Sequence, residues 1–210
     1  MNKRKSASTT NAAPETGDDR AAAPYTRSRE ERLAAGSAMR TALARSAHAK
    51  LATASRDVID LLDESNRGRL PNLAPIRYGR MLHSPFAFMR GAAAVMAYDL
   101  GHAPNSGIHT QLCGDCHLNN FGGYASPERE LLYGINDFDE TLPGPFEWDL
   151  KRLATSVVIA ARDQRVPERH CIEAAQAVSR SYRQRMLEYS TFAYQRSSTL
   201  DAEYSSMCWR

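Results

Sequence analysis

The sequence predicts an α+β fold that is mostly helical and contains a small sheet. Apolar residues recur at helical spacing in the segments 148–161 and 167–189, whereas the run Glu130-Leu-Leu-Tyr-Gly-Ile135 has the character of a strand. Polar motifs rich in Asp and Asn follow two short apolar segments. A chain of 210 residues, 42% of them hydrophobic, can bury one ordinary core, so we expect one domain over residues 31–210.

The N-terminal part of the chain divides at about residue 30. Residues 1–30 are rich in Ala, Ser, Thr, Pro and charge and lack hydrophobic periodicity, which predicts a disordered tail. From Arg32 to about Leu62 the pattern is Ala-rich and helical, and it predicts one or two helices. The apolar positions of this segment are Leu43, Leu51, Val58, Ile59, Leu61 and Leu62.

Proline marks the boundaries in the middle of the chain. Pro71 and Pro75, with Asn and Gly nearby, predict a loop before the segment 77–82. Ser84-Pro85 is typical of a helix start with Pro at the first helical position, and we expect that helix to run to about Leu100. A loop rich in His, Pro, Asn and Gly then leads into the short segment 110–112.

The strand predicted at 130–135 delivers the polar run Asn136-Asp-Phe-Asp-Glu140. We expect this strand and the segment 110–112 to lie side by side, so that the polar loops after them meet. Pro143, Gly144 and Pro145 predict an irregular segment next. The two long helices that follow have their apolar positions at Leu150, Leu153, Val157, Val158, Ala161, Ile172, Ala175, Val178, Tyr182 and Met186.

Charge and hydropathy exclude two classes of partner. The 27 basic and 24 acidic residues are mixed along the chain, with neither a basic face nor interleaved aromatics, so we expect no nucleic-acid partner. No apolar run approaches the roughly 18 residues of a membrane span, so we expect no membrane partner. The N-terminus lacks the apolar region of a secretory signal, and the cysteines do not form a disulfide framework, which favours the cytoplasm.

The two polar motifs carry the residue types that phosphoryl transfer needs. That reaction requires a carboxylate to orient the attacking hydroxyl and oxygen ligands to hold Mg²⁺ against the phosphates. In kinases an Asp and an Asn five residues later serve these purposes, and Asp115 and Asn120 have that spacing. A second Asp must arrive on a neighbouring strand, and Asp137 follows the strand predicted at 130–135. A lone Asp-x-Asp turn is more often a solvated loop, but the pairing with Asp115 favours a site.

Gly114-Asp-Cys-His-Leu-Asn-Asn120 and Gly134-Ile-Asn-Asp-Phe-Asp139 together resemble the site of the aminoglycoside phosphotransferase and choline kinase group within the protein-kinase-like fold. Trp148-Asp-Leu150 and Arg152-Leu153 add to the likeness. In that group an Asp-Leu pair opening the next helix anchors the catalytic loop. The resemblance therefore implies a structural role for Asp149. It also implies that the domain is similar to the C-terminal, catalytic lobe of that fold.

Longer motifs are similar to a bacterial family of unknown function, the domain of unknown function 2252. They are Ser84-Pro-Phe-Ala-Phe-Met-Arg-Gly91, the Gly-Asp-x-His-x-x-Asn-Phe-Gly motif at 114–122, and the segment 136–153. Several long motifs agree in order, over roughly residues 70–190. This makes the resemblance specific.

The resemblance implies a role for each residue of the site. Asp115 would be the catalytic base or would orient the acceptor, while His117 and Arg90 would fix the loop or contact phosphate. Asn120 and Asp137 would bind Mg²⁺, with Asp139 as a second ligand. The nucleotide would be ATP or GTP, and the acceptor an unidentified hydroxyl or amine of a small molecule or protein.

One part of a kinase has no counterpart in this sequence. Nothing before Asp115 supplies a Gly-rich strand-turn-strand or a Lys–Glu pair to clamp the nucleotide. The resemblance implies members about twice as long, with these segments downstream of the catalytic motifs, so we expect a chain truncated at its C-terminus. A non-catalytic pseudo-enzyme or regulatory binding module is the alternative that this difference favours.

Cys113-Gly-Asp-Cys116-His117 also matches the attachment motif of c-type haem, which leaves a remote alternative. Haem attachment takes place after export, and the sequence shows no export signal. A structural zinc site would need further ligands, whereas Cys171 and Cys208 are distant and single. We therefore prefer the phosphotransferase interpretation of this motif.

Overall fold

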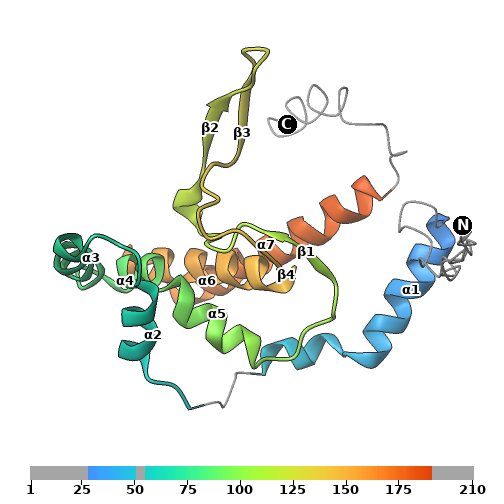
Figure 1. Ribbon diagram of the computed structural model, residues 1–210. Helices are drawn as coiled ribbons and strands as arrows, with labels where there is room; N and C mark the ends of the chain where they lie inside the picture. Colours follow the sequence, from blue (N-terminus) through green and yellow to red (C-terminus); the bar gives the residue numbers. More distant parts are fainter. Residues whose placement is uncertain (1–27, 51–54, 191–210) are drawn as a thin grey trace, which may run out of the picture.

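The computed structural model describes residues 28–50 and 55–190, and their elements confirm a mostly helical α+β fold (Figure 1). In chain order these are α1 (Arg29–Ala42), η2 (Arg45–Ala49), α2 (Val58–Ser65), η3 (Pro71–Leu73), α3 (Ala74–Met81), α4 (Pro85–Gly91), α5 (Ala93–Gly101), β1 (His109–Leu112), η4 (Leu118–Asn120), β2 (Phe121–Ala125), β3 (Leu131–Ile135), β4 (Leu142–Pro145), α6 (Glu147–Asp163) and α7 (Glu168–Tyr189). Most of the predicted tail lies outside the described residues, and α1 already begins at Arg29. None of the described helices is long and apolar enough to span a membrane.

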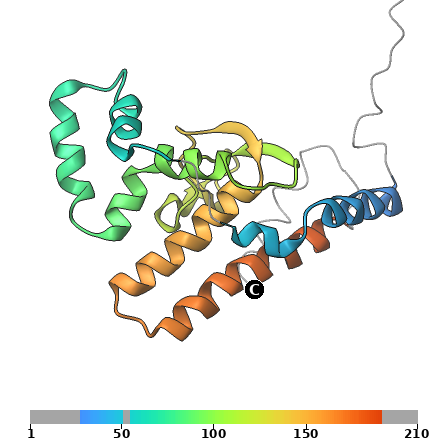
Figure 2. The ribbon, with the colours of Figure 1, turned by 90° about the horizontal axis from the view of Figure 1, so that it is seen from below.

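The two long helices predicted near the C-terminus are confirmed as α6 and α7. They pack against each other as an antiparallel pair (Figure 2). α4 and α5 contact α6 from the other side, and α2 packs on α5. A small core joins α2, α3 and α5 through the buried side chains of Leu62, Met81, Ala92 and Val95.

The strands form two separate antiparallel pairs. β1 pairs with β4, and β2 pairs with β3 in a hairpin that projects away from the helices in Figure 1. The strand predicted at 130–135 is therefore confirmed as β3. The expectation that it lies beside the segment 110–112 is wrong, because β1 and β3 belong to different pairs. A backbone hydrogen bond from the N–H of Asn136 to the carbonyl of Asn120, at 3.0 Å, joins the two polar loops instead.

The segment 143–145, predicted to be irregular, forms most of β4. Its register pairs Pro143 with Gln111 and Pro145 with His109. A two-stranded sheet leaves one edge of each strand unpaired, so a proline without an N–H can be accommodated there. The two prolines would argue against a strand in the middle of a larger sheet, but they do not prevent pairing on one edge, as in β4.

The single helix predicted from Ser84 to Leu100 is two helices. Its start is confirmed, since the Ser84 hydroxyl accepts a hydrogen bond from the N–H of Ala87 at 3.1 Å. The helix ends at Gly91 and restarts after Ala92, whose backbone has φ −116° and ψ 39°. Two arginines donate to carbonyls at this break. Arg77 donates to that of Gly91 at 2.6 Å, and Arg152 donates to that of Met89 at 2.8 Å, which also accepts the N–H of Ala92.

Candidate active site

The loop between β1 and η4 is held in place by the start of α6. The carboxylate of Asp149 accepts the N–H of Cys113 at 2.7 Å and the N–H of Gly114 at 3.1 Å. Asp149 makes no capping hydrogen bond to α6 itself. Its position thus agrees with an anchor for the loop rather than a helix cap, and burial raises the pKa of this carboxyl although both hydrogen bonds lower it.

Two further residues of α6 hold the same loop. Arg152, only 2% exposed, donates from Nε to Oδ1 of Asp115 at 2.7 Å, and its Nη2 binds the same oxygen. The hydroxyl of Ser156, fully buried, accepts the N–H of Leu118 at 3.2 Å. Asp149, Arg152 and Ser156 thus form a polar stripe that faces the loop from one side of the helix.

Arg152 was not among the site residues predicted from the sequence. A signal was present, because polar residues at positions 149, 152 and 156 have the helical spacing of one face, alongside the apolar residues of α6. Polar side chains that become buried when such a helix packs must find partners inside the protein. The stripe lies on a helix and outside the two polar motifs, so Arg152 received no role from the sequence.

Gly114 allows the loop to turn onto Asp149. Its φ of +84° is disfavoured for other residues, and a Cβ there would collide with the backbone carbonyl of Glu140. We expect Gly114→Ala to lower the free energy of unfolding, measured in urea, by about 2 kcal/mol or more. Gly107 has φ +74° with open space around it, so Gly107→Ala should cost only about 1 kcal/mol. Equal losses in the two variants would contradict the close packing of the loop against Glu140.

Asp115 is a half-buried carboxylate with a partner on each oxygen. Arg152 occupies Oδ1, while Nε2 of His117 lies 3.3 Å from Oδ2. Burial raises the pKa of Asp115, but the hydrogen bond from His117 and the charge of Arg152 outweigh it, so the pKa falls below its ordinary value. The carboxylate is therefore ionised at neutral pH, which suits orienting a hydroxyl better than removing its proton.

His117 is buried at 2% exposure, between Asp115 and the ring of Phe86. Its Nδ1 has no hydrogen-bond partner among the described residues. When Nε2–H donates to Asp115, Nδ1 carries the lone pair and can accept a hydrogen bond from a bound molecule. The residue can thus fix the Asp115 carboxylate and contact a ligand.

Asn120 and Asp137 present oxygen atoms suited to a hard cation. The amide Nδ2 of Asn120 donates to the carbonyl of Asp115 at 2.8 Å, which leaves Oδ1 available. Oδ1 of Asp137 accepts the N–H of Asp139 at 3.2 Å, while no described residue donates to Oδ2. The described residues contain no group of three or more His, Cys, Asp or Glu that could hold a metal. Any Mg²⁺ held by Asn120 and Asp137 would therefore need water or phosphate oxygens as its other ligands.

A cleft of about 920 Å³ brings most of the predicted residues together. Arg90, Asp115, His117, Asn120 and Asp137 all line it. Asp139 does not, and its side chain is exposed to solvent. The structure thus groups five of the six predicted residues and leaves one outside.

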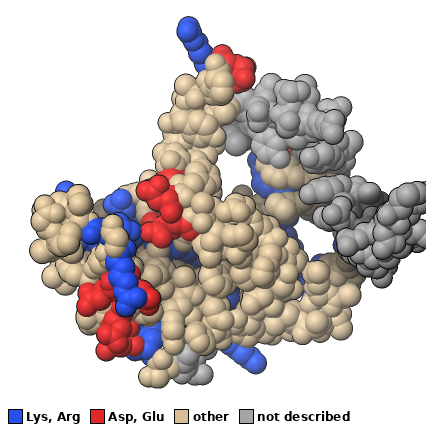
Figure 3. All heavy atoms as spheres, in the orientation of Figure 1, with Lys and Arg blue, Asp and Glu red and all other residues tan. Residues whose placement is uncertain are grey.

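Arginines also line this cleft, namely Arg69, Arg77, Arg80 and Arg90. The side chains of Arg80 and Arg90 have no ion pair or hydrogen bond within the described part of the chain. Figure 3 shows the basic and acidic side chains gathered on the face over α2 to α4 and the base of the hairpin. Unpaired guanidinium groups favour phosphate or carboxylate ligands.

The two cysteines of the loop are buried and free. Burial raises the pKa of Cys116 to about 12 and raises that of Cys113 as well, so both thiols stay protonated at neutral pH. Thioether bonds to haem need both thiols to be accessible. Their burial disfavours the haem alternative, and Cys208 lies outside the described residues.

Comparison with known proteins adds one finding. A family described as an uncharacterized protein conserved in bacteria (DUF2252) matches residues 69–207. This range includes the loop, both long helices and all five predicted residues that line the cleft. Neither the curated proteins nor the solved structures contain a match to the chain.

Proposed function

The chain belongs to the bacterial DUF2252 family, and from the site that its motifs build we propose that it is a Mg²⁺-dependent phosphotransferase. The donor would be ATP or GTP, and the acceptor a hydroxyl or amine of an unidentified small molecule or protein. The observation that carries the proposal is the shared cleft, in which Asp115, Asn120 and Asp137 face unpaired arginines. Phosphoryl transfer combines these two features, since it needs both metal ligands and cations around the phosphates.

Each residue would act through the contacts that it makes. Asp115, held by Arg152 and His117, would accept a hydrogen bond from the acceptor hydroxyl and align it. Oδ1 of Asn120 and Oδ2 of Asp137 would hold Mg²⁺, which when bound neutralises charge on the phosphate oxygens. Arg80 and Arg90, which line the same cleft, would donate hydrogen bonds to the phosphates.

Calorimetric titration of the chain with Mg²⁺ and ATP, and with GTP in parallel, tests the proposal. We expect Asp137→Ala to weaken binding by more than about 100-fold, since even the partners of metal ligands contribute 10–100-fold. Asp139→Ala is the matched control, because it removes the same charge from the same loop but outside the cleft. Nucleotide binding that survives Asp137→Ala unchanged would exclude this site.

A non-catalytic binding module is the second candidate, and two observations favour it. Both oxygens of Asp115 already have protein partners, so the carboxylate could be purely structural. Within residues 28–50 and 55–190, no lysine forms an ion pair with a glutamate, so the Lys–Glu pair of kinases has no counterpart there. Nucleotide binding without transfer to water or to any alcohol would select this candidate.

A further inference from the structure

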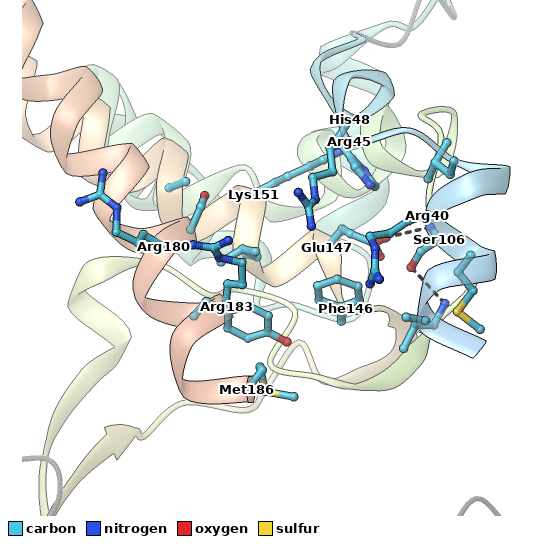
Figure 4. Close-up of a pocket in the computed structure, with 18 of the residues that line it drawn as sticks. Arg40, Arg45, His48, Ser106, Phe146, Glu147, Lys151, Arg180, Arg183 and Met186 are labelled. Carbon is cyan, nitrogen blue, oxygen red and sulfur yellow. Dashed lines mark hydrogen bonds between the residues drawn. The ribbon is translucent and has the colours of Figure 1, made fainter. Parts of the chain in front are cut away.

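A second cavity lies on the opposite side of α6 from the candidate active site. It has a volume of about 790 Å³ and is bounded by α1, η2, α6 and α7 (Figure 4). From α6 it takes Glu147, Leu150, Lys151 and Ala154, which point away from the stripe of Asp149, Arg152 and Ser156 on a helix of 3.6 residues per turn. The volume is in the range of sites for small molecules, roughly 300–1,000 Å³.

The walls of this cavity are mainly apolar. They include the side chains of Met39, Leu43, Ile108, Phe146, Leu150 and Met186. The rings of Phe146 and Tyr182 are stacked, with centroids 5.8 Å apart and an interplanar angle of 9°. Such a surface suits a flat ring system or a hydrocarbon chain.

One carboxylate is buried at the cavity. Glu147 is 5% exposed, and its Oε1 accepts the N–H of Ser106 at 2.8 Å. Its Oε2 is buried and has no hydrogen-bond partner among the described residues. A buried oxygen without a donor is costly, so it indicates a position where a ligand N–H or O–H belongs.

Positive charge exceeds negative charge around the cavity. Five basic residues line it, namely Arg40, Arg45, Lys151, Arg180 and Arg183, against the single carboxylate of Glu147. In the described part of the chain, none of the five side chains makes a hydrogen bond or an ion pair. The four arginines are exposed and surround the apolar walls, whereas Lys151 is partly buried.

We propose that this cavity binds an amphipathic anion, with an apolar ring or chain against Phe146 and Leu150 and an acidic group at the arginines. An N–H or O–H on the ligand would donate to Oε2 of Glu147. The site is separate from the phosphotransferase cleft and does not depend on its chemistry. With both sites occupied, α6 would lie between two ligands, one in the cleft at Asp115 and one in this cavity.

Two fluorescent probes that differ in one group test the proposal. 1-Anilinonaphthalene-8-sulfonate has an apolar body, an N–H and an anionic sulfonate, whereas N-phenyl-1-naphthylamine lacks the sulfonate. We expect one saturable site that binds the anionic probe about tenfold more tightly than the neutral one, as expected for hydrogen bonds to charged groups. Equal affinity for the two probes, or the absence of saturable binding, would overturn the proposal.

Variants then locate the site. The double variant R180Q/R183Q should abolish most of the advantage of the anionic probe while leaving the neutral probe unaffected. The control R169Q/R185Q removes the same charge from α7 outside the cavity and should change neither affinity. Equal loss in both double variants would show attraction by overall charge and contradict a site here.

The contact with Glu147 is tested by the neutral probe alone. Because this probe has no sulfonate, repulsion between the probe and the Glu147 carboxylate does not affect its affinity. Glu147→Gln should weaken the binding of N-phenyl-1-naphthylamine by about fivefold, since a carboxylate oxygen makes a stronger hydrogen bond than an amide oxygen. Unchanged or tighter binding of this probe would exclude the proposed donor contact. Far-ultraviolet circular dichroism of each variant establishes that it is folded before titration.

Discussion

Replacing Asp115 with Asn is expected to reduce phosphoryl transfer by about 10²-fold or more, the loss expected when a reacting group is no longer held in line. The amide keeps the shape of the side chain, but it is neutral and holds the acceptor hydroxyl more weakly than a carboxylate. Nucleotide binding should persist, because Asn120 and Asp137 carry the proposed metal contacts. The rate of ADP formation, with water and simple alcohols as acceptors, measures the first effect and calorimetry measures the second.

The separation of these two effects distinguishes a catalytic from a structural Asp115. A variant that binds nucleotide normally and turns it over at the wild-type rate would contradict the proposed role. Loss of both binding and rate, together with a large loss of stability, would instead indicate that Asp115 mainly holds Arg152. The unfolding transition of Asp115→Asn in urea is therefore measured alongside the rate.

Replacing Arg152 with Met is expected to lower the free energy of unfolding by about 3–5 kcal/mol, because it leaves Asp115 without its charged partner. The arginine also donates to the carbonyl of Met89, so the break between α4 and α5 loses a capping contact. Arg162→Met is the control on the same helix, since Arg162 pairs with Glu168 on the exposed surface and its loss should matter little. Urea unfolding at neutral pH compares the two variants.

The effect of Arg152→Met should depend on pH. In the wild type the pKa of Asp115 is lowered, so its contribution to stability is present above the ordinary pKa of 3.8 and is lost as pH falls through the lower value of the folded state. Without Arg152 only His117 opposes the effect of burial, so the pKa of Asp115 should rise above its wild-type value. The difference in stability between wild type and Arg152→Met should therefore shrink as the pH is lowered from 7 towards 4.

A double variant tests the same ion pair without changing pH. Adding Asp115→Asn to Arg152→Met removes the isolated charge, so the double variant should be more stable than Arg152→Met alone. A double variant with the summed losses of both single variants would contradict coupling between the two side chains. This double-mutant cycle thus measures the interaction free energy between Asp115 and Arg152.

Local signals were sufficient for several elements of this fold. Ser84-Pro85 set the start of α4, and regular apolar spacing located α6 and α7, because a capping hydroxyl and a helical face depend on neighbouring residues alone. The end of α4 was not predictable in this way. Its carbonyls are bound by Arg77 and Arg152, which lie 14 and 63 positions away from their partners.

The candidate active site likewise combines features set by local spacing with features set by contacts between distant segments. The spacing of Asp115 and Asn120 and the later Asp137 identified three residues that the structure places in one cleft. The pairing of β1 with β4 rather than with β3 depends on contacts between distant segments, so the route by which the two loops meet was not visible in the sequence. Arg152 was part of the resemblance but received no role from the sequence, because its partner Asp115 lies 37 positions away.

The sequence by itself determined the family, the mostly helical α+β class and the residues of the two polar motifs, since each depends on residue type and local spacing. Only the tertiary structure decided which side chains share a cleft, that Asp139 lies outside it, and that Arg152 holds Asp115. It also revealed the cavity at Glu147, which is bounded by α1, η2, α6 and α7. The physical reason is that burial, ion pairing and cavity shape are set by residues far apart in the chain, whereas helix starts and helical faces are set by neighbours.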